Sequence, residues 1–140
     1  MTDSHSISNT ADCRIVTLSR HHHDEGNLTV ADLPYQPQRV YYLYDVPCGE
    51  ERGGHSHREC TEFLVAVAGS FSVEVSDGKN TKVFHLNRPD RGLLIPAGIW
   101  RVLNNFSSGS VCLVLASHKY DEADYVREYA EFQQLTKVKL

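Results

Sequence analysis

The sequence predicts an all-β fold, a sandwich or barrel of short strands, followed by one C-terminal α-helix. Between residues 13 and 116, short segments rich in β-branched and aromatic residues alternate with glycine and proline turns. After residue 120 the apolar residues recur at a spacing closer to 3.6 than to 2, which indicates a helix. A length of 140 residues with 41% hydrophobic residues suits one domain with a buried core.

Composition argues against several classes of function. The net charge is −4 and no basic run is present, so we expect no nucleic-acid partner. No apolar stretch approaches the ~20 residues of a membrane span, and the N-terminus lacks the features of a signal peptide. The four cysteines are widely spaced and form no CxxC pair. We therefore expect a cytoplasmic protein with reduced thiols and no membrane contact.

The first half of the chain begins with residues 1–12, which are polar and are expected to form a flexible tail. A single domain is expected over residues 13–134. Residues 13–19 alternate like a strand, residues 21–27 are interpreted as a polar turn, and residues 28–32 as a short strand. Residues 40–46 are aromatic and β-branched and suit a half-buried strand, and a glycine-rich loop follows over residues 47–54.

The second half reads as a series of hairpins. Strands are expected at residues 63–68, 71–76, 81–86, 93–95, 100–106 and 111–116. Asp77-Gly78 is a strong signal for a hairpin turn. The C-terminal helix is expected over residues 121–134, because acidic residues at its start would interact favourably with the helix dipole.

One pair of histidines suggests a functional pocket. His55 and His57 are separated by one residue, so both imidazoles lie on the same face of a strand. A carboxylate follows at Glu62. If this face points into a barrel, the three side chains converge in one pocket.

The residues around this pair resemble the cupin family. The spacing Gly49-x5-His55-x-His57-x4-Glu62-x6-Gly69 matches the first cupin motif, and the segment from Gly92 to Asn104 resembles the second. The second motif departs at Arg101, which stands where metal-binding cupins have a histidine ligand. The resemblance implies a cupin jelly-roll β-barrel.

A longer, ordered set of segments resembles the WxcM-like sugar 3,4-ketoisomerases within the cupins. It includes 39–45, 52–57, 92–100 and the stretch Tyr120-Asp-Glu-Ala-Asp-Tyr-Val-Arg127, and it spans residues 13–132. The resemblance implies an enzyme that moves the carbonyl of a dTDP-linked 4-keto-6-deoxyhexose from C4 to C3. It also implies a homodimer with exchanged N-terminal strands.

The chemistry of this reaction assigns roles to individual residues. Imidazole suits proton transfer at neutral pH, so we assign the base at C3 to His57 with His55 as its partner in proton shuttling. Arg101 is expected to stabilise the enediolate. The substrate-binding candidates are Tyr42 and Tyr44 for sugar hydroxyls, Trp100 for stacking, Arg52 and Arg127 for the diphosphate, and Glu25 near the sugar.

Two alternatives remain open at this stage. His55, His57 and Glu62 are good ligands for iron, manganese or zinc, so a metal-dependent cupin oxygenase or isomerase is possible. Arg101 argues against it, because a guanidinium at the fourth position would repel a divalent cation. We therefore expect no metal or other cofactor. The other alternative is a non-catalytic sugar-binding cupin domain.

Overall fold

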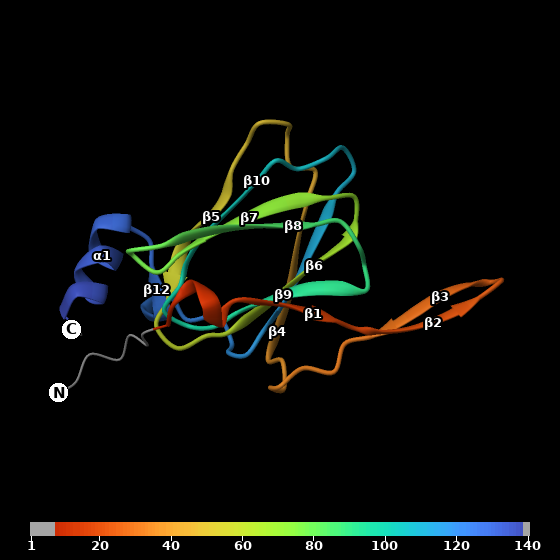
Figure 1. The fold of residues 1–140 in the computed structure, drawn as a ribbon, viewed down its shortest axis with the longest axis horizontal. Helices are drawn as coiled ribbons and strands as arrows, with labels where there is room; N and C mark the ends of the chain where they lie inside the picture. Colours follow the sequence, from red (N-terminus) through yellow and green to blue (C-terminus); the bar gives the residue numbers. More distant parts are fainter. Residues whose placement is uncertain (1–7, 139–140) are drawn as a thin grey trace.

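The computed structural model describes residues 8–138, which form two facing five-stranded antiparallel sheets (Figure 1). The first sheet has the order β1 (Arg14–Thr17), β9 (Arg91–Ile95), β6 (Glu62–Ala68), β11 (Val111–Ala116) and β4 (Arg39–Tyr44). The second has the order β12 (Tyr125–Val126), β5 (Arg52–His57), β10 (Trp100–Asn104), β7 (Phe71–Ser76) and β8 (Thr81–Leu86). This topology is compatible with the predicted cupin jelly roll.

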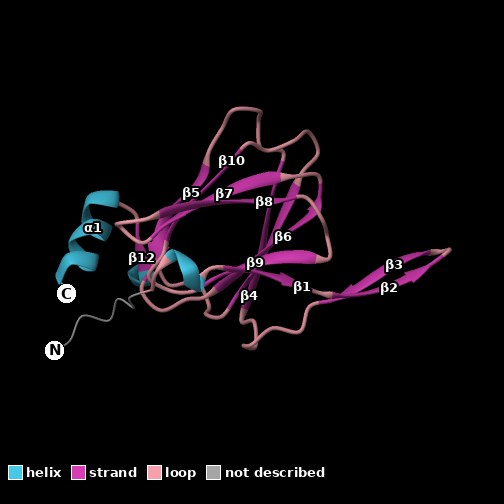
Figure 2. Ribbon diagram, in the orientation of Figure 1, coloured by secondary structure: helices cyan, strands magenta, loops and turns pink. Residues whose placement is uncertain are grey.

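A hairpin, one α-helix and two 3₁₀ turns lie outside the two sheets (Figure 2). A two-stranded hairpin of β2 (Ser19–His23) and β3 (Gly26–Val30) extends away from the sheets. Helix α1 (Tyr129–Val138) lies at the opposite end of the molecule, and two short 3₁₀ turns cover Thr10–Asp12 and Glu122–Asp124. The prediction of an all-β fold with one C-terminal α-helix is therefore confirmed.

The core forms where the inward-facing side chains of the two sheets meet. Alternation places every second residue of a strand in this layer. The main buried cluster is aliphatic and aromatic, and it includes Leu64, Phe71, Val73, Val75, Leu93, Ile95, Ile99, Leu103 and Val114. Glycine is required at position 92, because a Cβ there would lie 2.2 Å from Cζ of Phe63. This close approach lets β9 pair with β6.

The structure corrects several predicted boundaries. His21, His22 and His23 belong to strand β2, since the tight turn is only Asp24-Glu25 and the strands on both sides pair fully. The C-terminal helix begins at Tyr129 and ends at Val138, so the expected range of 121–134 is wrong. The acidic residues instead form the 3₁₀ turn, because Asp121 accepts a hydrogen bond from the Ala123 amide, and a short strand on β5 follows.

The N-terminal tail is partly ordered. Ser8 Oγ donates to the Ala97 carbonyl at 2.8 Å, and the Thr10 amide donates to Asp77 Oδ2 at 3.1 Å. Asn9 caps the turn that follows it. The predicted flexible tail is therefore wrong for residues 8–12, and its first seven residues lie outside the described part. Among residues 8–138, no helix is long and apolar enough to cross a membrane.

Candidate active site

A cavity of about 410 Å³ opens between the two sheets. This volume suits a small-molecule ligand. Its lining combines apolar side chains with converging charged ones and consists of Arg39, Tyr41, Leu43, Arg52, Gly53, His55, Glu62, Leu64, Arg101, Leu103, Val114, Tyr120, Tyr125 and Arg127. Strands β4, β5, β6, β10, β11 and β12 therefore all contribute to one site.

The two histidines of β5 share a face but occupy different depths. His55 lines the cavity and retains 7% exposure, whereas His57 is fully buried behind it. Their Nε2 atoms lie 3.0 Å apart, and the Tyr125 ring packs within 5.0 Å of both imidazoles. Only His55 is therefore placed to touch a molecule in the cavity, although the sequence pattern does not distinguish the two residues.

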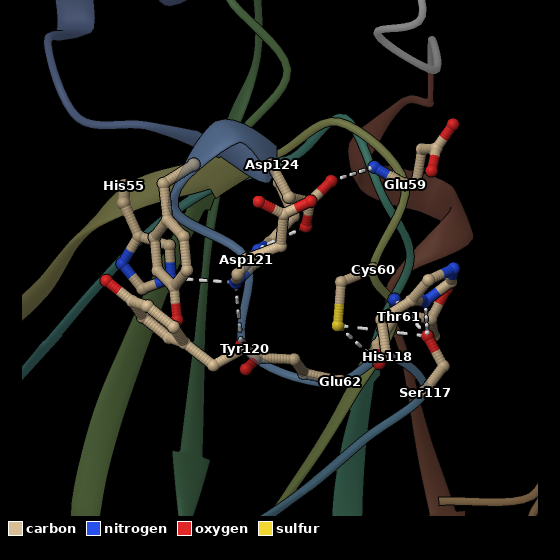
Figure 3. A network of polar contacts seen from close by, with 12 residues as sticks. His55, Glu59, Cys60, Thr61, Glu62, Ser117, His118, Tyr120, Asp121 and Asp124 are labelled. Carbon is tan, nitrogen blue, oxygen red and sulfur yellow. Dashed lines mark hydrogen bonds and ion pairs between the residues drawn. The ribbon is translucent and has the colours of Figure 1, made fainter. Parts of the chain in front are cut away.

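Asp124 holds the buried end of the histidine pair (Figure 3). Its Oδ2 lies 2.9 Å from His57 Nδ1, and its Oδ1 accepts the Glu59 amide at 2.7 Å. The 3₁₀ turn and β12 bring it there, since Tyr125 pairs with His57 in the sheet. Asp124, His57 and His55 thus form a continuous chain of contacts that ends at the cavity.

Arg101 lies beside His55 as a buried guanidinium. The two residues are directly paired across β10 and β5. Arg101 Nη1 donates to Glu62 Oε1 at 2.6 Å, and its Nε and Nη2 donate to the Ile99 carbonyl at 3.4 and 3.2 Å. A guanidinium has five N–H groups. Within the described residues, three of the five are engaged, so two remain for a ligand.

Glu62 is committed to this network. Tyr41 donates its hydroxyl to Glu62 Oε2 at 2.7 Å, and His57 Nε2 lies 3.5 Å from Oε1. Burial alone would raise the pKa of the Glu62 carboxyl, but the neighbouring His57, the charge of Arg101 and the hydrogen bond from Tyr41 together lower it to about 2. Burial and the charge of Glu62 raise the pKa of the Tyr41 hydroxyl far above its usual value. Tyr41 therefore stays protonated and donates.

His55 is held in its neutral form. Burial, the charge of Arg101 and the neighbouring His57 lower the pKa of the His55 imidazole to about 2. His55 is therefore neutral at physiological pH, and one of its ring nitrogens carries a lone pair. Its cation would be unfavourable unless the charge moved elsewhere.

The donor set does not fit a metal well. The ligand atoms of His55, His57 and Glu62 lie within 4.8 Å of one another, as a metal site requires. However, Glu62 is already in an ion pair with Arg101, whose guanidinium would face any bound dication. Both His55 and His57 also use Nε2 for their mutual contact. The residues present are those of an internal ion-pair network rather than of a vacant coordination sphere.

Three further arginines add positive charge to the cavity. Arg52 and Arg127 both line it, as expected for the residues predicted to bind a diphosphate. Glu122 accepts from Arg127 Nε and Nη2 at 2.6 and 2.8 Å. Arg39 was not among the predicted site residues, yet its Nε is a buried donor with no partner within the described residues.

Four predicted ligands lie outside the cavity of this chain. Tyr42 and Tyr44 face outward with 59% and 61% exposure, since alternation on β4 turns Tyr41 and Leu43 inward. Trp100 also points away, because its neighbour Arg101 points inward, and its ring packs on Tyr129 and Phe132 instead. Glu25 lies at the turn of the β2–β3 hairpin, away from the sheets (Figure 1).

The residues of the site that sequence reasoning missed include Arg39, Tyr41 and Asp124. Tyr41 could have been predicted from the alternation of β4 if another residue had shown which face of the strand points inward. Arg39 has the same parity as Tyr41 and would have followed. Asp124 is 67 residues from His57 in sequence, and no local pattern connects them.

Comparisons with known proteins identify relatives of this chain. The model of the family described as "FdtA: WxcM-like, C-terminal" matches residues 11–137. The chain is 38% identical over 103 residues to the TDP-4-oxo-6-deoxy-alpha-D-glucose-3,4-oxoisomerase of Aneurinibacillus thermoaerophilus, covering 74% of each protein.

Solved structures of related enzymes superpose closely. A 3,4-ketoisomerase from Helicobacter canadensis matches with a TM-score of 0.87 and 36% identity, covering 90% of this chain and 98% of that one. The QdtA 3,4-ketoisomerase from Thermoanaerobacterium thermosaccharolyticum, solved as a histidine-to-asparagine variant with TDP-4-keto-6-deoxyglucose, matches with a TM-score of 0.88 and 31% identity over 91% and 96% of the chains. This chain therefore belongs to the WxcM-like, C-terminal (FdtA) family.

Proposed function

We propose that this chain is a sugar 3,4-ketoisomerase that moves the carbonyl of a dTDP-linked 4-keto-6-deoxyhexose from C4 to C3. The observation that carries the proposal is the placement of neutral His55 on the cavity wall directly beside the Arg101 guanidinium. A proton acceptor and a fixed cation are the two groups that enolisation next to a carbonyl requires. The kinship with 3,4-ketoisomerases supports the same reaction.

His55 is the base in this mechanism, in place of the expected His57. Its Nδ1 has no hydrogen-bond partner within the described residues, whereas its Nε2 faces His57. The Nδ1 lone pair takes the proton from C3, and the electrons of the C–H bond form a C3–C4 double bond. The C4 carbonyl oxygen thereby becomes an oxyanion. His57 takes part through His55 rather than by contact with the sugar.

Arg101 stabilises the oxyanion through its two uncommitted N–H groups. A preorganised donor of this kind lowers the barrier by about 3 kcal/mol. The hydroxyl proton on O3 then moves to O4, and the proton held by the histidine returns to C4. A carbonyl forms at C3, and atoms and charge balance because the product is an isomer of the substrate.

The rim arginines suit the diphosphate of a nucleotide sugar. Arg52 and Arg127 line the cavity, and guanidinium groups pair well with phosphate oxygens. Arg39 lies deeper, and its unpartnered Nε offers a donor to a sugar oxygen. We assign the diphosphate to Arg52 and Arg127, and a sugar hydroxyl to Arg39.

The hairpin supports a homodimer with exchanged N-terminal strands. The side chains of β2 are exposed, and on β3 the apolar residues Leu28 and Val30 are exposed as well. A second chain would cover them, and the hairpin tip would carry Glu25 away from its own chain. The four cysteines are all free thiols, which is in keeping with the cytoplasmic location we propose.

The test is turnover in deuterated water. We expect dTDP-4-keto-6-deoxyglucose to give a 3-keto product by NMR, with deuterium entering at the exchanging carbons. His55→Asn should abolish both, while His85→Asn, which changes an exposed histidine outside the cavity, should leave both intact. Binding of the sugar without any 3-keto product would favour the non-catalytic alternative and overturn the proposal.

A further inference from the structure

We propose that Asp124 is the positioning residue of the site, and that it sets the proton positions on both histidines so that His55 presents a lone pair to the cavity. The inference rests on the proposed function only in naming His55 as the base. The arrangement of Asp124, His57 and His55 is a property of the resting protein and can be tested without substrate.

The geometry fixes Asp124 from several sides. Its two carboxylate oxygens are used separately, with Oδ1 on the Glu59 amide and Oδ2 on His57 Nδ1. Its carbonyl accepts the Arg58 amide at 2.8 Å, which ties the 3₁₀ turn to the end of β5. These contacts hold the carboxylate in one orientation. The pairing of the backbone around Asp124 with the end of β5 places it against His57.

Proton positions follow from this contact. An ionised carboxylate can only accept, so His57 Nδ1 carries the hydrogen. In neutral imidazole the other nitrogen is then an acceptor, so His57 Nε2 receives a hydrogen bond from His55 Nε2 at 3.0 Å. The remaining nitrogen, His55 Nδ1, is left with its lone pair free. The Asp124 carboxylate thus determines, through the His57 ring between them, which nitrogen of His55 can act as a base.

Asp124 also determines where the positive charge resides during the reaction. When His55 Nδ1 takes the proton from C3, its Nε2 proton passes to His57 Nε2, and His55 stays neutral. The resulting His57 imidazolium lies between Asp124 at 2.9 Å and Glu62 at 3.5 Å. A cation on His55 would instead lie beside Arg101. The reverse shift returns the proton for delivery to C4.

The decisive variant is Asp124→Asn. The amide oxygen can keep the Glu59 contact, which turns the NH₂ group toward His57 Nδ1. His57 would then carry its hydrogen on Nε2 and donate to His55, which would leave His55 Nδ1 protonated and unable to accept. We expect kcat to fall about 10²- to 10⁴-fold, as for a histidine base held in the wrong tautomer, with KM changed less than about threefold.

Asp121→Asn is the matched control. It makes the same chemical change three residues away, on a carboxylate that caps the 3₁₀ turn and has no contact with either histidine in the described structure. We expect its kcat to equal that of the wild type. An Asp124→Asn enzyme with wild-type kcat would overturn the inference while leaving the ketoisomerase function intact.

Nitrogen-15 NMR of the unliganded, chelator-treated protein reads the tautomers directly. We expect the hydrogen on Nδ1 of His57 and on Nε2 of His55 in the wild type, and the reverse in Asp124→Asn. Resonances are assigned from the His55→Asn and His57→Asn variants. A wild-type protein with the hydrogen on Nε2 of His57 would contradict the inference, whether or not the protein turns over sugar. Absence of turnover in a wild type with the expected tautomers would instead contradict only the proposed function.

Discussion

At the scale of single residues, Arg101 and Glu62 form an ion pair whose side chains are only 1% and 2% exposed. Loss of one member would leave the other as a buried charge without its partner. We therefore expect Arg101→Met to lower the free energy of unfolding by about 3–5 kcal/mol and to abolish turnover. Urea unfolding followed by circular dichroism measures the first effect, and the NMR turnover assay measures the second.

The partly exposed pair of Arg88 and Asp90 provides the control. Arg88 Nε donates to Asp90 Oδ1 at 2.8 Å, and the two side chains are 48% and 10% exposed. Water reaches the guanidinium of this pair, so Arg88→Met should lower the urea midpoint much less than Arg101→Met does. Equal losses of stability in the two variants would mean that burial of the Arg101–Glu62 pair does not increase the cost of breaking it.

His55 gives the protein a specific pH dependence. Its pKa is about 2 in the folded state and 6.5 in the unfolded state, so the unfolded chain binds more protons between these values. The contribution of His55 to the free energy of unfolding is therefore fully present above pH 6.5 and decreases as the pH falls below this value. Between pH 7.5 and pH 5 we expect a loss of about 2 kcal/mol from His55 alone, measured by urea unfolding at both values.

His55→Asn separates this effect from other groups. The substitution removes the titrating imidazole, so the loss of stability between pH 7.5 and pH 5 should largely disappear. Glu62, whose folded pKa is also lowered, contributes stability that is lost only as the pH falls below its usual value of 4.5. An unchanged loss in His55→Asn would show that another group titrates in this window.

At the scale of elements, Trp100 belongs to the interface between β10 and helix α1. Its ring centroid lies 5.2 Å from that of Tyr129 and 5.8 Å from that of Phe132. Trp100→Leu should therefore lower the free energy of unfolding by about 1–3 kcal/mol and leave KM for the nucleotide sugar unchanged. Steady-state kinetics measure KM, and urea unfolding measures the free energy of unfolding. A large rise in KM with unchanged stability would restore the predicted role in stacking on the substrate.

Strand parity explains which site residues the sequence could predict. The motif around His55 and Arg101 fixed an inward face for β5 and β10, so their place in the site was predictable. From Val40 to Tyr44, both faces of β4 carry large apolar or aromatic side chains. The sequence pattern therefore does not say which face is buried. The pairing of β4 with β11 decides it, because Tyr41 lies opposite the buried Val114 and therefore faces inward.

The C-terminal segment shows a second limit of prediction from sequence. Its acidic and apolar spacing fits the start of a helix, and that local preference was the basis for the range 121–134. The pairing of Tyr125 and Val126 with His57 and Ser56 overrides it, and the helix starts only afterwards. Such pairing between segments almost 70 residues apart is absent from any local pattern. It also creates the contact between Asp124 and His57, which is why that residue was missed.

At the scale of the whole molecule, the β2–β3 hairpin pairs with neither of the two five-stranded sheets. Its strands pair only with each other, and it projects from the sheets with Glu25 at its turn (Figure 1). On the outer face of the first sheet, a depression of about 530 Å³ is lined by residues that include Leu18, Val65, Val67 and Leu115. A partner that covers this face would complete a dimer. In a dimer with exchanged hairpins, we expect Glu25 to serve the cavity of the partner.

Complementation between two impaired chains tests this arrangement. We expect Glu25→Ala and His55→Asn each to lower kcat/KM as separate proteins. If the hairpin crosses to the partner, a refolded equimolar mixture contains heterodimers in which one cavity combines intact His55 with intact Glu25. Random pairing predicts activity at about a quarter of the wild-type sites. If the hairpin instead serves its own chain, each cavity of the heterodimer carries one lesion, and mixing restores nothing. An active Glu25→Ala homodimer would remove Glu25 from substrate binding, and light scattering of the wild type reports independently whether the dimer forms.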